Sequence, residues 1–264
     1  MPTDSTQPPA FWHRAVSLLI AIAILGGLFA YAFATNSYHW NWHSVWVYRA
    51  LFVQGWLVTL LLSVISLAAS CLIGSLLTLL RRTPFLPLRY LSRICVESIR
   101  GTPLLVQLLI FYYVVAESFH FQNVYLNEAF QNRYFVGVLT LSIFSGAYIS
   151  EVIRAGIESI AASQLESARA IGLTTAQTYR FVIIPQAIRQ ILPPLAGQFA
   201  SLVKDSSLLS IIGISEFTLN AQNVSSYTYS NFESYLPLAL GYLLLTLPIS
   251  LFTQSLERRH RFET

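Results

Sequence analysis

One pair of ionisable side chains, Lys204 and Asp205, lies in the middle of an otherwise apolar stretch, residues 191–215. Charged groups inside a membrane are costly, and they usually face a cavity or a charged partner. The Asp205 carboxylate can accept an ammonium group, with the hydroxyls of Ser206 and Ser207 assisting. Two interpretations stand side by side. The pair forms part of a site for an ionic solute in a broken span, or it is an ion pair at the outer interface.

Two further polar side chains are candidates for the same pathway. Gln107 comes four residues after the turn-like break Arg100-Gly-Thr-Pro103 and either faces a pathway or bonds a neighbouring helix. Tyr148 follows two small residues, Gly146 and Ala147, and lines a cavity or packs against a neighbour. Glu97 with Arg100, and Glu151 with Arg154, have the three-residue spacing that allows pairing on one helix face, which favours a role at helix ends.

The sequence gives no indication of metal, cofactor or catalytic chemistry. His39 and His43 are four residues apart, but Tyr-His-Trp-Asn-Trp-His is typical of an aromatic segment at a membrane interface. The two cysteines have neither disulfide nor metal-ligand spacing. An intramembrane enzyme needs paired aspartates, or a serine with a histidine, within its spans. Asp205 is the only aspartate at membrane depth and no histidine falls within a span, so we expect a protein that is not an enzyme.

The composition indicates an all-α integral membrane protein. Of 264 residues, 55% are hydrophobic and only 11% are charged, about half the charge of a soluble domain. About six transmembrane helices are expected over six apolar segments: 15–34, 52–80, 104–116, 134–150, 191–215 and 234–256. The first segment contains 20 residues without a charge, longer than a usual signal-peptide core, so a retained anchor is favoured despite the cleavage-like Ala32-Phe-Ala34.

The distribution of arginine predicts the orientation. One assignment places 13 arginines in inner loops and only Arg49 and Arg133 in outer loops, so both termini are expected in the cytoplasm. The resulting organisation is a cytoplasmic tail at 1–14, an extra span at 15–34, an extracytoplasmic linker at 35–51, a core at 52–258 with a cytoplasmic loop at about 155–188, and a tail at 259–264.

The cytoplasmic loop carries signals for two short helices. Ser163 with Glu166, and Thr174 with Gln177, have capping-box spacing, and Gly172 between them suits the left-handed residue after a helix. The second helix is expected to run to about Ile184, because Pro185 cannot continue it unkinked. On these signals alone, a surface for a partner protein and a solvated linker remain equally open.

Longer motifs resemble a known family. Glu166-Ser-Ala168, then Gly172, then Val182-Ile-Ile-Pro185 resembles the EAA loop of ATP-binding-cassette importer permeases, with matching spacing and three mild substitutions. Three more stretches resemble the polar amino-acid branch, which serves His, Glu, Gln, Arg and opines: residues 97–107, 146–151 and 202–208. The resemblance covers residues 52–258, a five-helix core to which the first span looks like an addition.

The resemblance implies a permease subunit of the bacterial inner membrane that forms the pathway for a polar amino acid. It implies four kinds of partner: cytoplasmic ATP-binding subunits, a second permease subunit (the same or a related chain), an extracytoplasmic solute-binding protein and membrane lipid. Nothing indicates nucleic acid. The implied ATPase-coupling residues are Glu166, Ser167, Ala168, Arg169, Ala170, Gly172 and Pro185, and the candidate pathway residues are Lys204, Asp205, Ser206, Gln107 and Tyr148. The alternative is a secondary transporter or channel that works without ATP, which would leave the capped loop unexplained.

Overall fold

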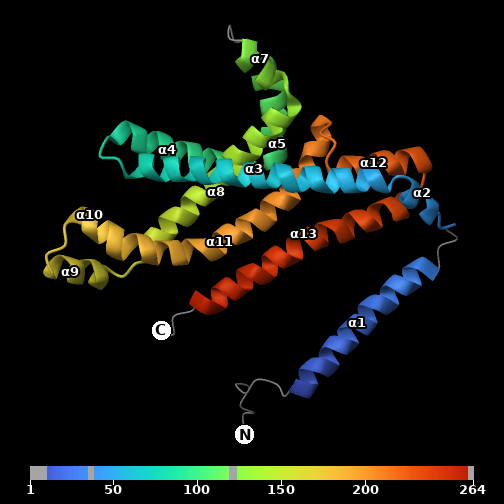
Figure 1. Cartoon of the computed structure of the whole chain (residues 1–264), viewed down its shortest axis with the longest axis horizontal. Helices are drawn as coiled ribbons and strands as arrows, with labels where there is room; N and C mark the ends of the chain where they lie inside the picture. The colour runs from blue at the N-terminus through green and yellow to red at the C-terminus, as the bar shows by residue number, and fades with distance from the viewer. Residues whose placement is uncertain (1–10, 35–38, 119–123, 261–264) are drawn as a thin grey trace. The chain divides into compact units, whose positions relative to one another are not determined.

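The computed structural model describes residues 11–34, 39–118 and 124–260, and all regular structure within these ranges is helical. The chain divides into two compact units, Met1–Asn41 and Trp42–Thr264. The first unit contains α1, Phe11–Ala34 (Figure 1). The expectations for the cytoplasmic tails fall largely on residues 1–10 and 261–264, which lie outside the described residues.

The second unit contains the predicted core. Its helical segments in chain order are α2 (Trp42–Val47), α3 (Arg49–Arg82), α4 (Leu86–Arg100), α5 (Leu104–Ile110), η1 (Phe111–Val115), α6 (Ala116–Ser118), α7 (Val124–Gln131), α8 (Arg133–Glu158), α9 (Ala162–Ala170), α10 (Thr175–Thr178), η2 (Tyr179–Ile183), α11 (Ile184–Asp205), η3 (Ser206–Ile212), α12 (Phe217–Thr228) and α13 (Asn231–His260).

Three of the described helices, α3, α8 and α13, are each long and apolar enough to cross a membrane, and a fourth crossing results if α4 and the α5–α6 segment count as one broken span. The axis of the chain bends by 108° between these two halves, at the predicted break, residues 100–103. The segment 191–215 is also broken, because α11 ends at Asp205 and a 3₁₀ turn follows. The all-α membrane architecture is therefore confirmed, and the described residues supply three or four of the six expected crossings by this measure.

The long helix α3 buries mainly small and polar residues and exposes many of its leucines, although Phe52 and Leu62 are also buried. Its buried face repeats every three or four residues and contains Thr59, Ser63, Ser66, Ser70, Gly74 and Thr78. Its exposed face carries Leu57, Leu61, Leu72, Leu76 and Leu79. A helix in water has the opposite arrangement. In lipid, small residues at the interface allow close packing of helices and leucines can face the hydrocarbon.

The buried face of α3 packs against α8, and the two helices run in the same direction (Figure 1). The Ser142 hydroxyl lies 3.4 Å from the Ser66 carbonyl oxygen, and the Thr78 hydroxyl donates to the Ser150 carbonyl at 3.1 Å. Between these contacts, a Cβ atom at Gly74 would lie 2.9 Å from the carbonyl oxygen of Gly146. The absence of a side chain at this crossing therefore sets the distance between the two helices.

Replacing Gly74 with alanine is expected to destabilise the isolated subunit by about 1–3 kcal/mol, because the backbone of α8 must move away. The matched control is Gly197→Ala in α11, where a new Cβ meets nothing within 4 Å. That variant is expected to be neutral or up to about 1 kcal/mol more stable, since alanine favours a helix. Thermal unfolding of both variants in detergent checks the pair, and equal melting temperatures would contradict the packing argument.

Candidate coupling loop and solute pathway

The first loop helix, α9, begins two residues earlier than expected and without a side-chain cap. Ala161 is its N-cap, and the Gln164 N–H bonds the Ala161 carbonyl at 3.0 Å. Ser163 is thus the second residue inside the helix, so the predicted capping box of Ser163 and Glu166 is wrong. The pattern was misleading because a cap needs extended backbone at the serine, and here Ala161 has that conformation.

Gly172 ends α9 as predicted, in the left-handed conformation with φ of 80°. The Gly172 N–H bonds the Arg169 carbonyl at 3.0 Å, and the Leu173 N–H bonds the Ala168 carbonyl at 3.1 Å. These two bonds form a Schellman motif, which satisfies the last carbonyls of the helix. A Cβ at Gly172 would meet nothing within 4 Å, so backbone conformation and not crowding favours glycine here.

The second capping box is confirmed. The Gln177 N–H bonds the Thr174 hydroxyl at 3.3 Å, and the Thr174 N–H bonds the Gln177 side chain at 2.9 Å. The predicted end of this helix near Ile184 is wrong. A π-helical turn follows α10, in which the Ile184 N–H bonds the Tyr179 carbonyl, and α11 continues through Pro185. The wider turn accommodates the proline without breaking the helix, because a π-turn moves the carbonyl that its ring would otherwise meet.

The predicted coupling residues divide into a buried one and an exposed set. Ala168 is only 3% exposed, on the side of α9 that packs against α10 and η2, so its small size serves packing within the subunit. Pro185 is exposed at the start of α11, away from α9 in sequence. Ile171, next to Gly172, is 76% exposed and is not among the predicted coupling residues. The other predicted members of the loop surface are all exposed: Glu166, Ser167, Arg169, Ala170 and Gly172.

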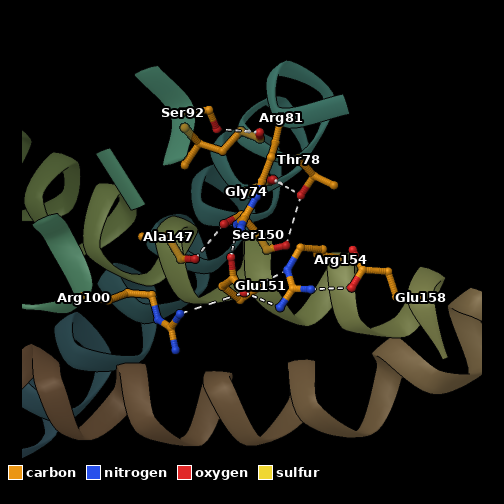
Figure 2. A network of polar contacts seen from close by, with 11 residues as sticks. Gly74, Thr78, Arg81, Ser92, Arg100, Ala147, Ser150, Glu151, Arg154 and Glu158 are labelled. Atoms are coloured by element: carbon orange, nitrogen blue, oxygen red, sulfur yellow. Dashed lines mark hydrogen bonds and ion pairs between the residues drawn. The ribbon is translucent and has the colours of Figure 1, made fainter. Parts of the chain in front are cut away.

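An ion network ties together α3, α4 and α8 near the loop (Figure 2). The Glu151 carboxylate on α8 pairs with Arg81 of α3 and with Arg154 of α8, whose Nη2 lies 2.7 Å from Oε2. Arg100 at the end of α4 reaches the same oxygen at 3.9 Å. The predicted Glu151–Arg154 pair is confirmed. The expected Glu97–Arg100 pair is not among the ion pairs of the described residues, since Arg100 points to Glu151 instead.

Beside this network lies an open cavity of about 510 Å³ between α8 and α11. Tyr148 lines it, and the Arg100 guanidinium lies 5.2 Å from the centre of the Tyr148 ring. The α11 side of the cavity carries Gln190 and Gln198, and the Gln198 amide donates to the Ser145 hydroxyl at 3.0 Å. The structure thus places one of the predicted pathway residues, Tyr148, at this cavity.

The other predicted pathway residues lie elsewhere. The Gln107 amide nitrogen lies 2.7 Å from the Ile99 carbonyl and 2.8 Å from the Thr102 hydroxyl, so it holds the break between α4 and α5. Lys204 is exposed and Asp205 half-buried at the end of α11. Within the described ranges neither forms an ion pair or side-chain hydrogen bond. The Ser206 hydroxyl is buried and donates to the Val203 carbonyl.

Glu216 is a buried polar residue that sequence reasoning missed. Its side chain is fully buried and accepts from the Leu219 N–H at 2.8 Å, from the Tyr242 hydroxyl at 3.0 Å and from the Thr59 hydroxyl at 3.3 Å. It therefore caps α12 and joins that helix to α3 and α13. Its position directly before Phe217, after an apolar stretch, was the available signal, but glutamate is an unusual N-cap residue.

Apolar spans, broken helices beside an open cavity, and a structured polar loop are the features of a membrane transport subunit. Residues 70–262 match the family described as "binding-protein-dependent transport system inner membrane component". The chain is 40% identical over 211 residues to the probable glutamine ABC transporter permease protein GlnM of Bacillus subtilis, covering 80% of this chain and 93% of that protein. It is 33% identical over 219 residues to the glutamine transport system permease protein GlnP of Escherichia coli K12, covering 83% and 97%.

Solved structures agree with this assignment. The fold matches an amino acid ABC transporter crystallised with histidines, with a TM-score of 0.75, 35% identity and coverage of 84% of this chain and 100% of that one. An inward-facing methionine transporter, MetNI, has a TM-score of 0.60 at 19% identity, which supports the fold alone. The chain belongs to the family of inner-membrane components of binding-protein-dependent transport systems. It is a multi-pass permease subunit of an ABC importer, and ATP hydrolysis takes place in a partner chain.

Proposed function

We propose that this subunit forms part of the pathway for a polar amino acid and is driven by ATP-binding subunits that dock on the loop of residues 163–185. Glutamine is the first candidate solute, because the relatives at 40% and 33% identity are named as glutamine permeases. The neighbouring solved transporter was crystallised with histidines, which keeps histidine as a second candidate. The amides of Gln190 and Gln198 and the carboxylate of Asp205 lie on one side of α11. Glutamine and histidine each have an ammonium, a carboxylate and a polar side chain that can bind these groups.

The observation that best supports the proposed pathway is a stripe of mostly polar side chains along α11. Gln190, Pro194, Gln198, Ser201 and Asp205 fall within an arc of about 80° at 100° per residue. The first three line the cavity, and the stripe extends it by two turns to the unpaired carboxylate at the end of the helix. A solute ammonium can bind that carboxylate, while the glutamine amides can bind a carboxylate or an amide side chain.

The proposed docking surface is the exposed side of α9 with its C-terminal end. It combines polar side chains, the small Ser167 and Ala170, and the apolar Ile171. The Schellman motif and the capping box hold the joint between α9 and α10 rigid, so a push on α9 is transmitted to α11. Since α11 is continuous from η2 to Asp205, the same helix links the loop to the stripe.

The proposed assembly has two permease subunits, the same or related, two ATP-binding subunits and an extracytoplasmic solute-binding protein. Both termini and the loop face the cytoplasm, which is supported by the 13 arginines on that side against two on the other. The N-terminal span α1 is an addition outside the matched residues 70–262.

Reconstitution tests this function. The chain is placed in proteoliposomes with candidate ATP-binding and solute-binding proteins, and uptake of labelled glutamine is measured with and without ATP, with histidine and arginine as competitors. We expect uptake that requires both ATP and the ATP-binding subunits. Uptake by the permease alone would instead support the alternative, an ATP-independent transporter or channel.

Replacing Asp205 with asparagine is expected to lower the rate of ATP-driven uptake about tenfold, because an ammonium loses a charged acceptor. The control is Glu97→Gln, which removes an exposed carboxylate from α4. Co-purification of the second permease subunit is measured alongside uptake. Normal uptake in the Asp205 variant would remove this residue from the pathway, and loss of the second subunit would place it at the contact between subunits.

A further inference from the structure

A second cavity, of about 370 Å³, lies between the end of α3, the start of α4 and the end of α8, and it shares only Arg154 with the cavity of the proposed pathway. Five guanidinium groups and one carboxylate face it, those of Arg81, Arg82, Arg89, Arg93, Arg154 and Glu158. The arginines come from three helices: the consecutive α3 and α4, and α8, which is distant in the sequence. A general excess of positive charge on the inner side of a membrane needs only scattered arginines. The gathering of five arginines at one cavity therefore calls for a separate explanation.

The positive charge at this cavity is only partly compensated within the chain. Arg81 and Arg154 pair with Glu151, and Arg154 also pairs with Glu158. The remaining three arginines form no ion pair among the described residues. Arg82 lies 3.4 Å from the Tyr179 hydroxyl, and Arg89 donates to the Thr83 carbonyl at 3.2 Å. No hydrogen bond of the Arg93 guanidinium occurs within the described part of the chain.

An exposed apolar face of α3 ends one turn before Arg82, which lines the cavity. Leu72, Leu76 and Leu79 lie on one face at helical spacing and are 75%, 56% and 67% exposed. Leu79 is one turn before Arg82. On α4, Ile94 is 62% exposed next to Arg93, and Tyr90 lines the cavity. Tyrosine favours the interface between hydrocarbon and water. The cavity therefore opens where an exposed apolar surface meets a cluster of unpaired positive charges.

We propose that this arginine pocket binds the phosphate headgroup of an anionic phospholipid, with an acyl chain lying along Leu72, Leu76 and Leu79. Guanidinium groups bind phosphate oxygens through paired N–H donors, and Arg89 and Arg93 have such donors available. The apolar stripe favours a lipid over free phosphate, which would gain nothing from it. The occupied leaflet is the cytoplasmic one under the orientation proposed above, whereas the pocket itself does not depend on that orientation.

The test uses the full chain, purified in a neutral detergent with any transporter subunits that remain bound. Dioleoyl phosphatidylglycerol, dioleoyl phosphatidylcholine or inorganic phosphate is added, and native mass spectrometry measures the fraction of protein with bound lipid. The variant is R89Q/R93Q, which leaves the Glu151 network intact. The control is Arg258→Gln, which removes an exposed arginine at the end of α13, outside the pocket.

We expect wild type and the Arg258 variant to bind phosphatidylglycerol more tightly than phosphatidylcholine, and R89Q/R93Q to bind it about thirtyfold more weakly than wild type. Leu76→Gln is expected to weaken phosphatidylglycerol binding as well. Three results would overturn the proposal: no preference of wild type for the anionic lipid, equal weakening in the Arg258 variant, or displacement of the lipid by millimolar inorganic phosphate. None of these depends on uptake, so failure here is distinct from failure of the proposed transport function.

Discussion

Replacing Ile171 with aspartate is expected to prevent stable association with the ATP-binding subunits while leaving the permease folded. Ile171 is 76% exposed in the subunit, so the change removes no contact from its interior. In the proposed complex the side chain is buried in the partner's groove. Loss of that burial, together with the cost of enclosing a carboxylate, is expected to weaken docking at least about a hundredfold.

Co-purification of the ATP-binding subunits and solute-stimulated ATP hydrolysis measure this effect. Ile171→Met keeps an apolar side chain of similar size and is expected to retain association. Ser163→Asp places the same new charge at the first turn of α9, where a helix tolerates it, and separates a general charge effect from a local one. Full association of the Ile171→Asp variant would mean that the docking surface does not include the end of α9.

The loop shows which local features the sequence predicts well. Gly172 and the Thr174–Gln177 box were predictable because each motif is complete within six residues and depends on backbone conformations that few residue types favour. The start of α9 and its buried face were less predictable. Ser163 has the right spacing for a cap, but the extended backbone lies at Ala161, and the contacts of α9 with α10 and η2 bury Ala168.

Contacts between distant segments account for most of what the sequence did not reveal. The hydropathy of residues 52–80 predicted a span, and the spacing of small residues on α3 becomes informative once α8 is placed against it. The helix α4 was not expected, because residues 83–100 are rich in arginine and were assigned to a loop. Its strongly two-sided pattern, with Ser92 and Val96 buried, was the signal that could have identified it.

The Glu151 network also depends on contacts between distant segments, which the sequence alone does not reveal. Its loss is expected to destabilise the isolated subunit more than any other substitution considered. Replacing Glu151 with glutamine keeps the size of the side chain but leaves Arg81, Arg100 and Arg154 without their shared carboxylate. The Glu151 side chain is only 16% exposed, so water compensates poorly for the loss. We expect the subunit to be destabilised by about 2–3 kcal/mol, at the low end for a partly buried ion pair that loses one partner.

Glu158→Gln is the matched control for this change. Glu158 is 54% exposed and pairs with Arg154 alone, so its replacement is expected to cost less than about 1 kcal/mol. Thermal unfolding in detergent compares the two, and we expect only the Glu151 variant to lower the melting temperature, by roughly 5–10 °C.

A double substitution separates the loss of attraction from the repulsion that remains. If unpaired guanidinium groups are the main cost, Arg81→Gln combined with Glu151→Gln should be more stable than Glu151→Gln alone, because one of three like charges is removed. If the main cost is the lost connection between α3 and α8, the double variant should be no more stable than the single one. Equal stability of the Glu151 and Glu158 single variants would exclude both explanations, because it would mean that one carboxylate shared by three helices contributes no more than an exposed pair on one helix.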